Sequence, residues 1–261
     1  MRYLITILIL SASLWAQGIG GKAGIGGKAG IGGGASAAAS LAFVNKSDSG
    51  NFQASGTSIA TAATSLTAGN FIICSQANSN ISATATGVTD TAGNTYHAIT
   101  PITQTGKVIE SWYAYNALGN GSNIVTFAMA ASLSNGEAWC SQFSGVKTSG
   151  DPINQTASGS NTGSITTLTS GAFTTTVTAN QLLFTAMSAS GGGPGESWTT
   201  GQACGTTTCT TSNGTTGTTN GSYFGDQYAI VSVTQTAQTM TVLNSAAGQI
   251  IMSVATFKAA P

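Results

Sequence analysis

Residues 67–146 contain five short apolar runs: TAGNFIICSQA (67–77), VTDTAGNTY (88–96), VIESWYAY (108–115), NIVTFAM (123–129) and GEAWCSQFSGV (136–146). Clusters of Gly, Asn, Asp and Ser separate the runs, a pattern that predicts β-strands joined by turns. The run NFIICSQA places apolar side chains on both faces, which indicates a strand in the middle of a sheet. Thr, Val, Ile and aromatic residues dominate, and these suit a pleated surface. The chain is therefore expected to be all-β.

The second half of the chain repeats this scheme more faintly. TANQLLFTAM, YFGDQYAIVSV, QTMTVL and AGQIIMSVATFK follow in the same order, displaced by about 110–116 residues. We interpret residues 67–146 and 178–258 as pseudo-repeats. Each copy has too few strands to bury both faces of a sheet, so residues 36–261 are expected to form a single antiparallel β-sandwich, jelly-roll-like in outline. The link at 151–178 is rich in Thr and is expected to add edge strands.

The first 16 residues have the pattern of a secretory signal peptide. Arg2 precedes an apolar core at 4–10, and small residues follow, with Ala16 the expected last residue before cleavage. The apolar run is shorter than the roughly 20 residues that a membrane-spanning helix needs. The mature chain is therefore predicted to be exported and to lack a transmembrane segment.

Residues 17–35 form a Gly-rich tail, GIGGKAGIGGKAGIGGGA from 18 to 35, with glycine at every third position. A flexible linker and an extended glycine helix that packs in an assembly are both compatible with this composition. A collagen helix also needs abundant proline, which the tail lacks. Near-matches to dinucleotide- and phosphate-binding motifs lack the strand and helix that those motifs require, so no cofactor is expected.

Composition excludes some classes of partner. Charged residues make up only 5% of the chain, and after residue 35 there is no arginine and only four lysines. Nucleic-acid recognition relies on Lys and Arg, so it is not expected. The surface must be built from Ser, Thr, Asn, Gln and Gly, and its low charge favours association between copies.

The four cysteines of an exported chain predict two disulfides. Cys204 and Cys209 flank GTTT, a spacing that suits closure of a hairpin-like loop. Cys74 would then pair with Cys140, although two other pairings remain formally open. No metal site is expected, because His97 is far from this cysteine pair in the sequence.

VTDTAGNTYHAI predicts a hairpin, with Asp90 accepting turn amides and Gly93 at positive φ. A calcium loop is the alternative, but calcium needs more acidic ligands than this segment offers. A catalytic triad would depend on His97, the single histidine, which we expect to be an ordinary surface or cross-strand residue.

Paired carboxylates are the stronger candidates for chemistry. At an offset of 116, Glu110 aligns with Asp226 and Trp112 with Tyr228, so both halves contain an acid followed two residues later by an aromatic. Related by a pseudo-twofold axis, these residues would meet in one groove, where aromatic faces beside carboxylates suit a sugar. Trp198, in a Gly-rich loop, could contribute to binding or could cap the core. An incidental position on the surface is the simpler interpretation of the acids.

The order of TDTAGNTY, FSGV, DPINQTASG and ATFK resembles that of bacterial secreted proteins described as Ig-like or β-sandwich surface domains. The resemblance covers roughly residues 40–258. It implies a β-sandwich and an extracytoplasmic address, and it brings no catalytic residues.

The expected function is that of a non-catalytic structural or adhesive protein, secreted to the cell surface or extracellular matrix and capable of self-association. The first alternative is a carbohydrate-binding module that recognises an extracellular polysaccharide. The second is a secreted glycoside hydrolase using Glu110 and Asp226.

Overall fold

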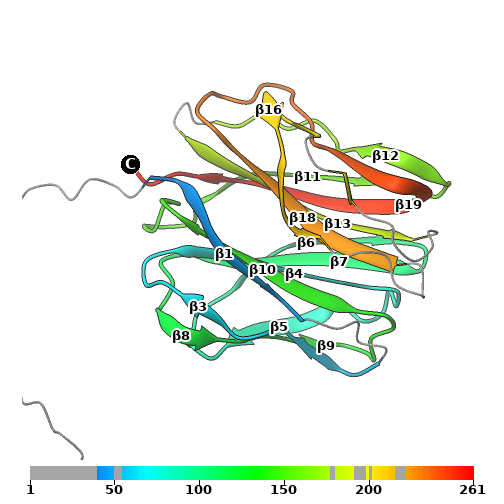
Figure 1. Cartoon of the computed structure of the whole chain (residues 1–261), viewed down its shortest axis with the longest axis horizontal. Helices are drawn as coiled ribbons and strands as arrows, with labels where there is room; N and C mark the ends of the chain where they lie inside the picture. The colour runs from blue at the N-terminus through cyan, green and yellow to red at the C-terminus, as the bar shows by residue number, and fades with distance from the viewer. Residues whose placement is uncertain (1–39, 50–54, 177–179, 191–197, 200–201, 215–221) are drawn as a thin grey trace, which may run out of the picture. The chain divides into compact units, whose positions relative to one another are not determined.

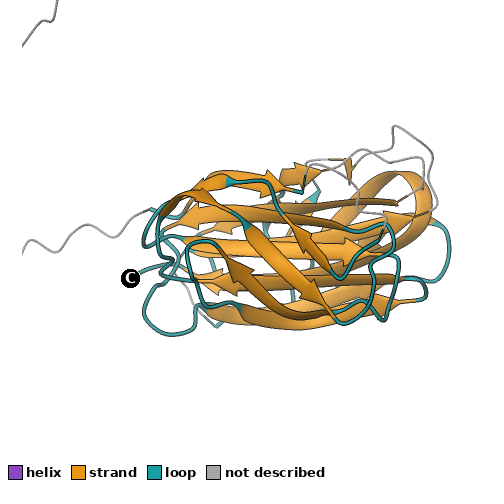
Figure 2. Cartoon of the chain, turned by 90° about the horizontal axis from the view of Figure 1, so that it is seen from below, coloured by secondary structure: helices purple, strands orange, loops and turns teal. Residues whose placement is uncertain are grey.

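Antiparallel strands account for the regular structure of the described residues, and no helix occurs among them (Figure 2). The computed structural model describes residues 40–49, 55–176, 180–190, 198–199, 202–214 and 222–261. The predicted signal peptide (1–16) and Gly-rich tail (17–35) lie outside them. The all-β, antiparallel prediction is confirmed. Within the described part of the chain, no helical segment has the length and apolarity needed to cross a bilayer.

The first half of the chain forms a large sheet, called here the first inner sheet, and a smaller first outer sheet. The inner sheet has the order β1 (Ala42–Asp48), β10 (Glu137–Ser144), β4 (Phe71–Asn78), β7 (Lys107–Ala114), β6 (His97–Gln104). The outer sheet has the order β2 (Ser58–Ala60), β9 (Val125–Met129), β5 (Ala85–Asp90), with β3 (Thr64–Leu66) pairing β8 (Asn120–Asn123) beside it.

The second half has a second inner sheet and a second outer layer. The inner sheet has the order β11 (Ile153–Ser160), β19 (Thr241–Lys258), β13 (Gln181–Ser190), β18 (Ser222–Val231), β17 (Thr210–Gly214). The outer layer contains β12 (Ile165–Thr169) and β14 (Trp198–Thr199), both paired with the beginning of β19, and the hairpin of β15 (Ala203–Cys204) and β16 (Thr207–Thr208).

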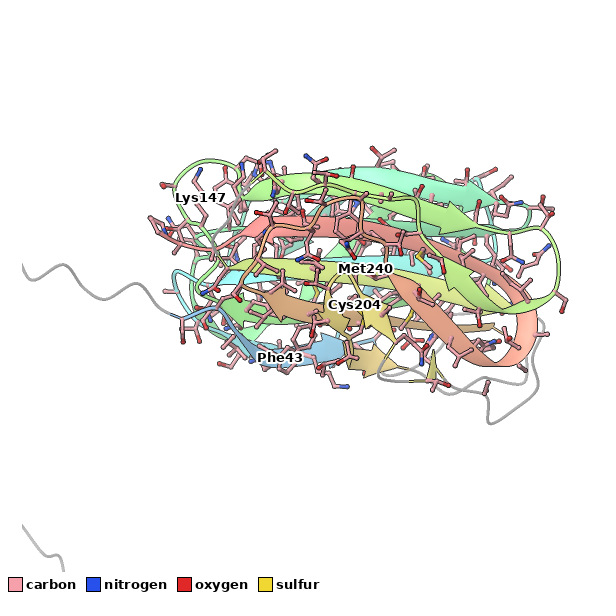
Figure 3. The ribbon with its side chains drawn as sticks, turned by 90° about the horizontal axis from the view of Figure 1, so that it is seen from above. Phe43, Lys147, Cys204 and Met240 are labelled. Atoms are coloured by element: carbon pink, nitrogen blue, oxygen red, sulfur yellow. A yellow bond between two sulfur atoms is a disulfide. The ribbon has the colours of Figure 1, made fainter. Side chains whose placement is uncertain are left out.

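Three buried clusters hold these layers together. The first lies between the inner and outer sheets of the first half and includes Cys74 and Phe127. The second lies beneath the outer layer of the second half and includes Cys204 and Met240, which form a β-bridge (Figure 3). The third, called here the shared core, joins the two inner sheets and includes Phe71 and Phe257. Figure 1 shows the resulting stack of layers.

The layering differs from the sequence-based expectation of one two-layered sandwich. Each half has a core of its own, because short strands such as β2, β5 and β9 in the first half, and β12 and β14 in the second, form an outer layer. The inner sheets then bury their remaining apolar faces against each other. The strand β4 is buried along its whole length between β10 and β7, as its two-sided apolar pattern predicted.

The two inner sheets have the same strand order and the same register. In the first, Ser75 lies between Trp139 and Ser111; in the second, Ala186 lies between Ser253 and Asp226. Their edge strands β1 and β11 pair with β10 and β19, and each has a register shift at its second or third residue. Across the shared core β1 lies against β17 and β11 against β6.

Both predicted disulfides are present. Cys74–Cys140 joins the neighbouring strands β4 and β10. Cys204–Cys209 closes the β15–β16 hairpin, as its spacing predicted. The prediction for VTDTAGNTYHAI was wrong in one respect: β5 and β6 do not pair with each other, because β5 joins the outer sheet and β6 the inner sheet. The turn between them therefore connects two layers.

Candidate functional site

Glu110 is an internal residue of the first half rather than part of an open groove. Its side chain is 1% exposed. Its Oε2 accepts hydrogen bonds of 2.7 Å from Gln76 Nε2 and from the backbone N–H of Ala85. Burial raises the pKa of Glu110, and these two hydrogen bonds only partly oppose the shift. The carboxylate thus links β7 to β4 and to the start of β5.

Asp226 lies in a different layer, on the face of β18 that is turned to the shared core. It is fully buried, and its Oδ2 accepts a hydrogen bond of 2.9 Å from Ser141 Oγ of the opposite half. Tyr228, on the same face of β18, stacks on Phe43 of β1 with ring centroids 5.4 Å apart. Phe43 is labelled in Figure 3. Burial, and then the Asp226 charge, raise the pKa of Tyr228.

The two tryptophans are separated in the same way. Trp112 is partly buried against the core of the first half, and Trp198 is buried in the core of the second. The five predicted groove residues, Glu110, Trp112, Trp198, Asp226 and Tyr228, are therefore distributed over three cores. The structure does not bring them together, and the two acids do not face one another across a substrate-sized space.

A one-residue error in alignment explains this outcome. Tyr113 of β7 and Tyr228 of β18 both pack against the shared core, and the register shifts of β1 and β11 fall at matching positions. These features relate β7 to β18 by an offset of 115, so Ser111 is the counterpart of Asp226 and Tyr113 that of Tyr228. The offset of 116 had matched Glu110 with Asp226. Because successive side chains of a strand point to opposite faces, a shift of one residue transfers every side chain to the wrong side of the sheet.

A surface pocket of the first half is a candidate site among the described residues. It has a volume of about 420 Å³, within the roughly 300–1,000 Å³ typical of small-molecule sites. The connections β5–β6 and β7–β8 form its walls. No Lys, Arg, Asp or Glu belongs to its lining, which consists of Gly93, Asn94, Thr95, His97, Tyr115, Asn116 and Leu118.

Asp90 holds one wall of this pocket in a fixed conformation. Its Oδ1 accepts hydrogen bonds from the backbone N–H groups of Gly93 (2.8 Å) and Asn94 (2.9 Å). Its Oδ2 accepts three more, from Asn94 Nδ2, Tyr96 Oη and Asn123 Nδ2. Burial alone would raise the pKa of Asp90, but these hydrogen bonds outweigh it and hold the pKa below its usual value. The predicted turn is thus a rigid loop, with Gly93 at positive φ.

His97 and Tyr115 contribute rings to the lining of the pocket. The rings of His97, Tyr113 and Tyr115 form a triangular cluster, with centroid distances from His97 of 5.4 Å to Tyr113 and 5.2 Å to Tyr115, and 6.5 Å between the two tyrosines. Asn94 Oδ1 accepts the N–H of Leu118 at 2.7 Å, which ties the two walls together. Asn116 has a positive φ of 51°, an uncommon conformation outside glycine. The sequence contained these residues in two runs, but only the fold showed that the runs meet.

Lys107 is a second feature that the sequence did not single out. It begins β7, is 2% exposed, and its Nζ has no hydrogen-bond partner. Burial lowers its pKa to about 8. Elsewhere, the described residues contain no cluster of three or more His, Cys, Asp or Glu side chains that could hold a metal ion.

Comparison with known proteins adds no relationship to this description: no protein-family model, no curated protein and no solved structure matches the chain.

Proposed function

We propose that the chain is an exported, non-catalytic β-sandwich protein that acts as a structural or adhesive component of the cell surface or extracellular matrix and associates with itself. Two disulfides support an oxidising compartment, where such bonds persist. The signal-like N-terminus supports the same address. The commitment of Glu110 and Asp226 to hydrogen bonds in separate cores favours a non-catalytic role over glycoside hydrolysis.

The edge strand β11 is the observation that carries the proposal of self-association. Its ladder partner in the inner sheet is β19, and its sequence, INQTASGS, contains no charge and no proline. On the other edge, Ser158 O accepts a hydrogen bond of 2.8 Å from the N–H of Gly171, so the proposed pairing uses the edge on either side of Ser158. Soluble proteins usually protect edge strands with charges, prolines or bulges, because a free edge can pair with another chain. β11 has a register shift at its beginning only. Thr156, Ser158 and Ser160 are exposed along it.

In this proposal, two copies pair antiparallel along β11 and extend the inner sheet across both molecules. Backbone hydrogen bonds would supply the attraction, as in other cases of strand addition. The low content of charged residues means that little electrostatic repulsion opposes the approach.

The matching order and register of the two inner sheets also support a history of duplication, in which each half derives from one ancestral unit. An interface with twofold symmetry is self-complementary, and it is the commonest arrangement in homodimers. The shared core would then descend from the interface between two separate copies.

Thr156→Lys tests the proposed pairing, because it places a charge on the edge strand at an exposed position. We expect the variant to remain monomeric at concentrations where the natural chain forms dimers or larger species in analytical ultracentrifugation. Ala128→Lys is the matched control, since Ala128 is exposed on β9, a central strand whose two edges are already paired. A natural chain that stays monomeric, or assembly that survives Thr156→Lys, would overturn the proposal.

A further inference from the structure

We propose that the pocket between the β5–β6 and β7–β8 connections binds a neutral saccharide, with Tyr115 as the stacking surface and Asn116 as the principal hydrogen-bonding side chain. This inference is independent of the proposed self-association. The two functions use different elements, since β11 contributes no residue to the pocket.

The chemistry of the lining indicates the class of ligand. A sugar ring presents an apolar face of C–H groups and a rim of hydroxyls, so it needs an aromatic or aliphatic surface beside groups that both donate and accept hydrogen bonds. Tyr115 and Leu118 supply the surface, and Leu118 is 57% exposed. The carboxamide of Asn116 has both donors and an acceptor, whereas that of Asn94 is already bonded to Asp90 and to Leu118.

Charge distinguishes this ligand from the alternatives. The lining contains no Lys, Arg, Asp or Glu. A phosphate, sulfate or carboxylate ligand would be expected to meet Lys or Arg, which are the usual partners of such groups. A cationic ligand would be expected to meet a carboxylate, but Asp90 faces the loop and is already used by its five hydrogen bonds.

The pocket is also formed in advance. Asp90 fixes the loop that contains Asn94, and the bond from Leu118 N–H to Asn94 Oδ1 fixes the opposite wall. Contacts with the rings of His97 and Tyr113, at centroid distances of 5.2 and 6.5 Å, hold the Tyr115 ring in place. A site whose side chains are already ordered loses less conformational entropy when a ligand binds.

The second half provides an internal comparison. The offset of 115 that relates β7 to β18 places Ile230 at the position of Tyr115. Ile230 is 38% exposed, but it is aliphatic and offers no aromatic face. The proposed site is therefore specific to the first half, and Ile230→Ala is a control in a related environment.

The experiment is binding of the exported full chain to an array of neutral oligosaccharides made of glucose, mannose, galactose or N-acetylglucosamine, followed by calorimetric titration of the best binder. Sialylated, sulfated and phosphorylated oligosaccharides on the same array are the charged comparison. We expect binding to at least one neutral class without preference for its charged derivatives. No neutral binder, or binding restricted to charged glycans, would overturn the proposal.

Three variants then locate the site. Tyr115→Ala should weaken binding about tenfold or more, while Tyr115→Phe, which keeps the ring, should stay within about threefold of the natural chain. Asn116→Gly removes the amide and suits the positive φ, so it should weaken binding without disturbing the backbone. Ile230→Ala should leave affinity unchanged. Equal affinities for the natural chain and Tyr115→Ala, with folding verified by circular dichroism, would place binding elsewhere and refute the assignment.

Discussion

Tyr113 of the first half meets Phe257 of the second edge-on, with ring centroids 5.2 Å apart and planes at 65°. The contact recurs with the halves exchanged, since Tyr228 meets Phe143 at 5.1 Å and 74°. Offsets of 115 and 114 relate the two tyrosines and the two phenylalanines. Such reciprocity is the property of an isologous interface, here within one chain.

Phe143→Ala and Phe257→Ala should therefore destabilise the chain by similar amounts, about 3–5 kcal/mol each, because both truncate a buried ring in the shared core. Chemical denaturation followed by fluorescence would measure the change. Phe127→Ala removes a ring from the core of the first half alone and serves as the comparison. A large loss of stability in one of these two variants and a negligible loss in the other would contradict the equivalence of Phe143 and Phe257.

Loss of the two disulfides should have unequal effects. Cys74–Cys140 closes a loop with a sequence separation of 66, and Cys204–Cys209 one of 5. On the chain-entropy view, replacing the first pair by alanines should cost about 4 kcal/mol and replacing the second about 2 kcal/mol. Thermal unfolding of the two double variants would rank them. A larger loss from the short hairpin would show that local packing, rather than loop length, dominates.

Glu110 should make stability depend on pH. Its folded-state pKa is raised by burial, so the folded chain binds a proton that the unfolded chain has released. Its contribution to stability is therefore full below the unfolded pKa of about 4.3 and declines as pH rises through the folded pKa. Glu110→Gln can still accept the two hydrogen bonds and should remove this decline, whereas Glu110→Ala should cost about 1–3 kcal/mol by leaving Gln76 and Ala85 unpaired. If the stability of Glu110→Gln declined with pH as steeply as that of the natural chain, Glu110 would not be the group responsible for the decline.

Lys107 should make the stability of the fold depend on pH in the alkaline range. Burial lowers its pKa from 10.5 to about 8, so between these values the unfolded chain holds the proton more often than the folded chain. Stability should accordingly rise as pH increases from about 8 to 10.5. Lys107→Met fills similar space without a charge and should raise stability at pH 7 by up to about 3 kcal/mol, while abolishing the rise. Urea unfolding at pH 7 and pH 10 would test this, and a less stable Lys107→Met would show that the amine has a partner.

Most strands could be predicted because each is marked by a pattern within a short stretch of the sequence. NFIICSQA is apolar on both faces and became the buried strand β4, while the Thr-rich link supplied the edge strand β11. The cysteine pairing followed from strand positions and loop spacing. The number of layers was less accessible, since β2, β3 and β8 are only three or four residues long and have no strong pattern.

The candidate sites depended on information that a single sequence does not contain. Whether Glu110 or Ser111 corresponds to Asp226 is a question of one residue in register, and it is answered only by the face of the sheet to which each side chain points. The pocket at Tyr115 requires two connections, separated by about twenty residues, to meet at one end of the sheet. His97, expected to be a surface or cross-strand residue, lies opposite Tyr113 in the β6–β7 ladder, but its ring contacts could not be inferred from the sequence.

The hydrogen bond between Ser141 and Asp226 has a further meaning if the halves are copies of one unit. In a symmetric pair of separate chains, every substitution occurs twice, so a buried carboxylate would bring a second one into the same interface. Here the counterpart of Asp226 is Ser111, and only one of the two symmetry-related positions holds an acid. Fusion into a single chain allows the two positions to change independently. The shared core can then bury one ionisable side chain, although burying two at the symmetry-related positions would destabilise it too much.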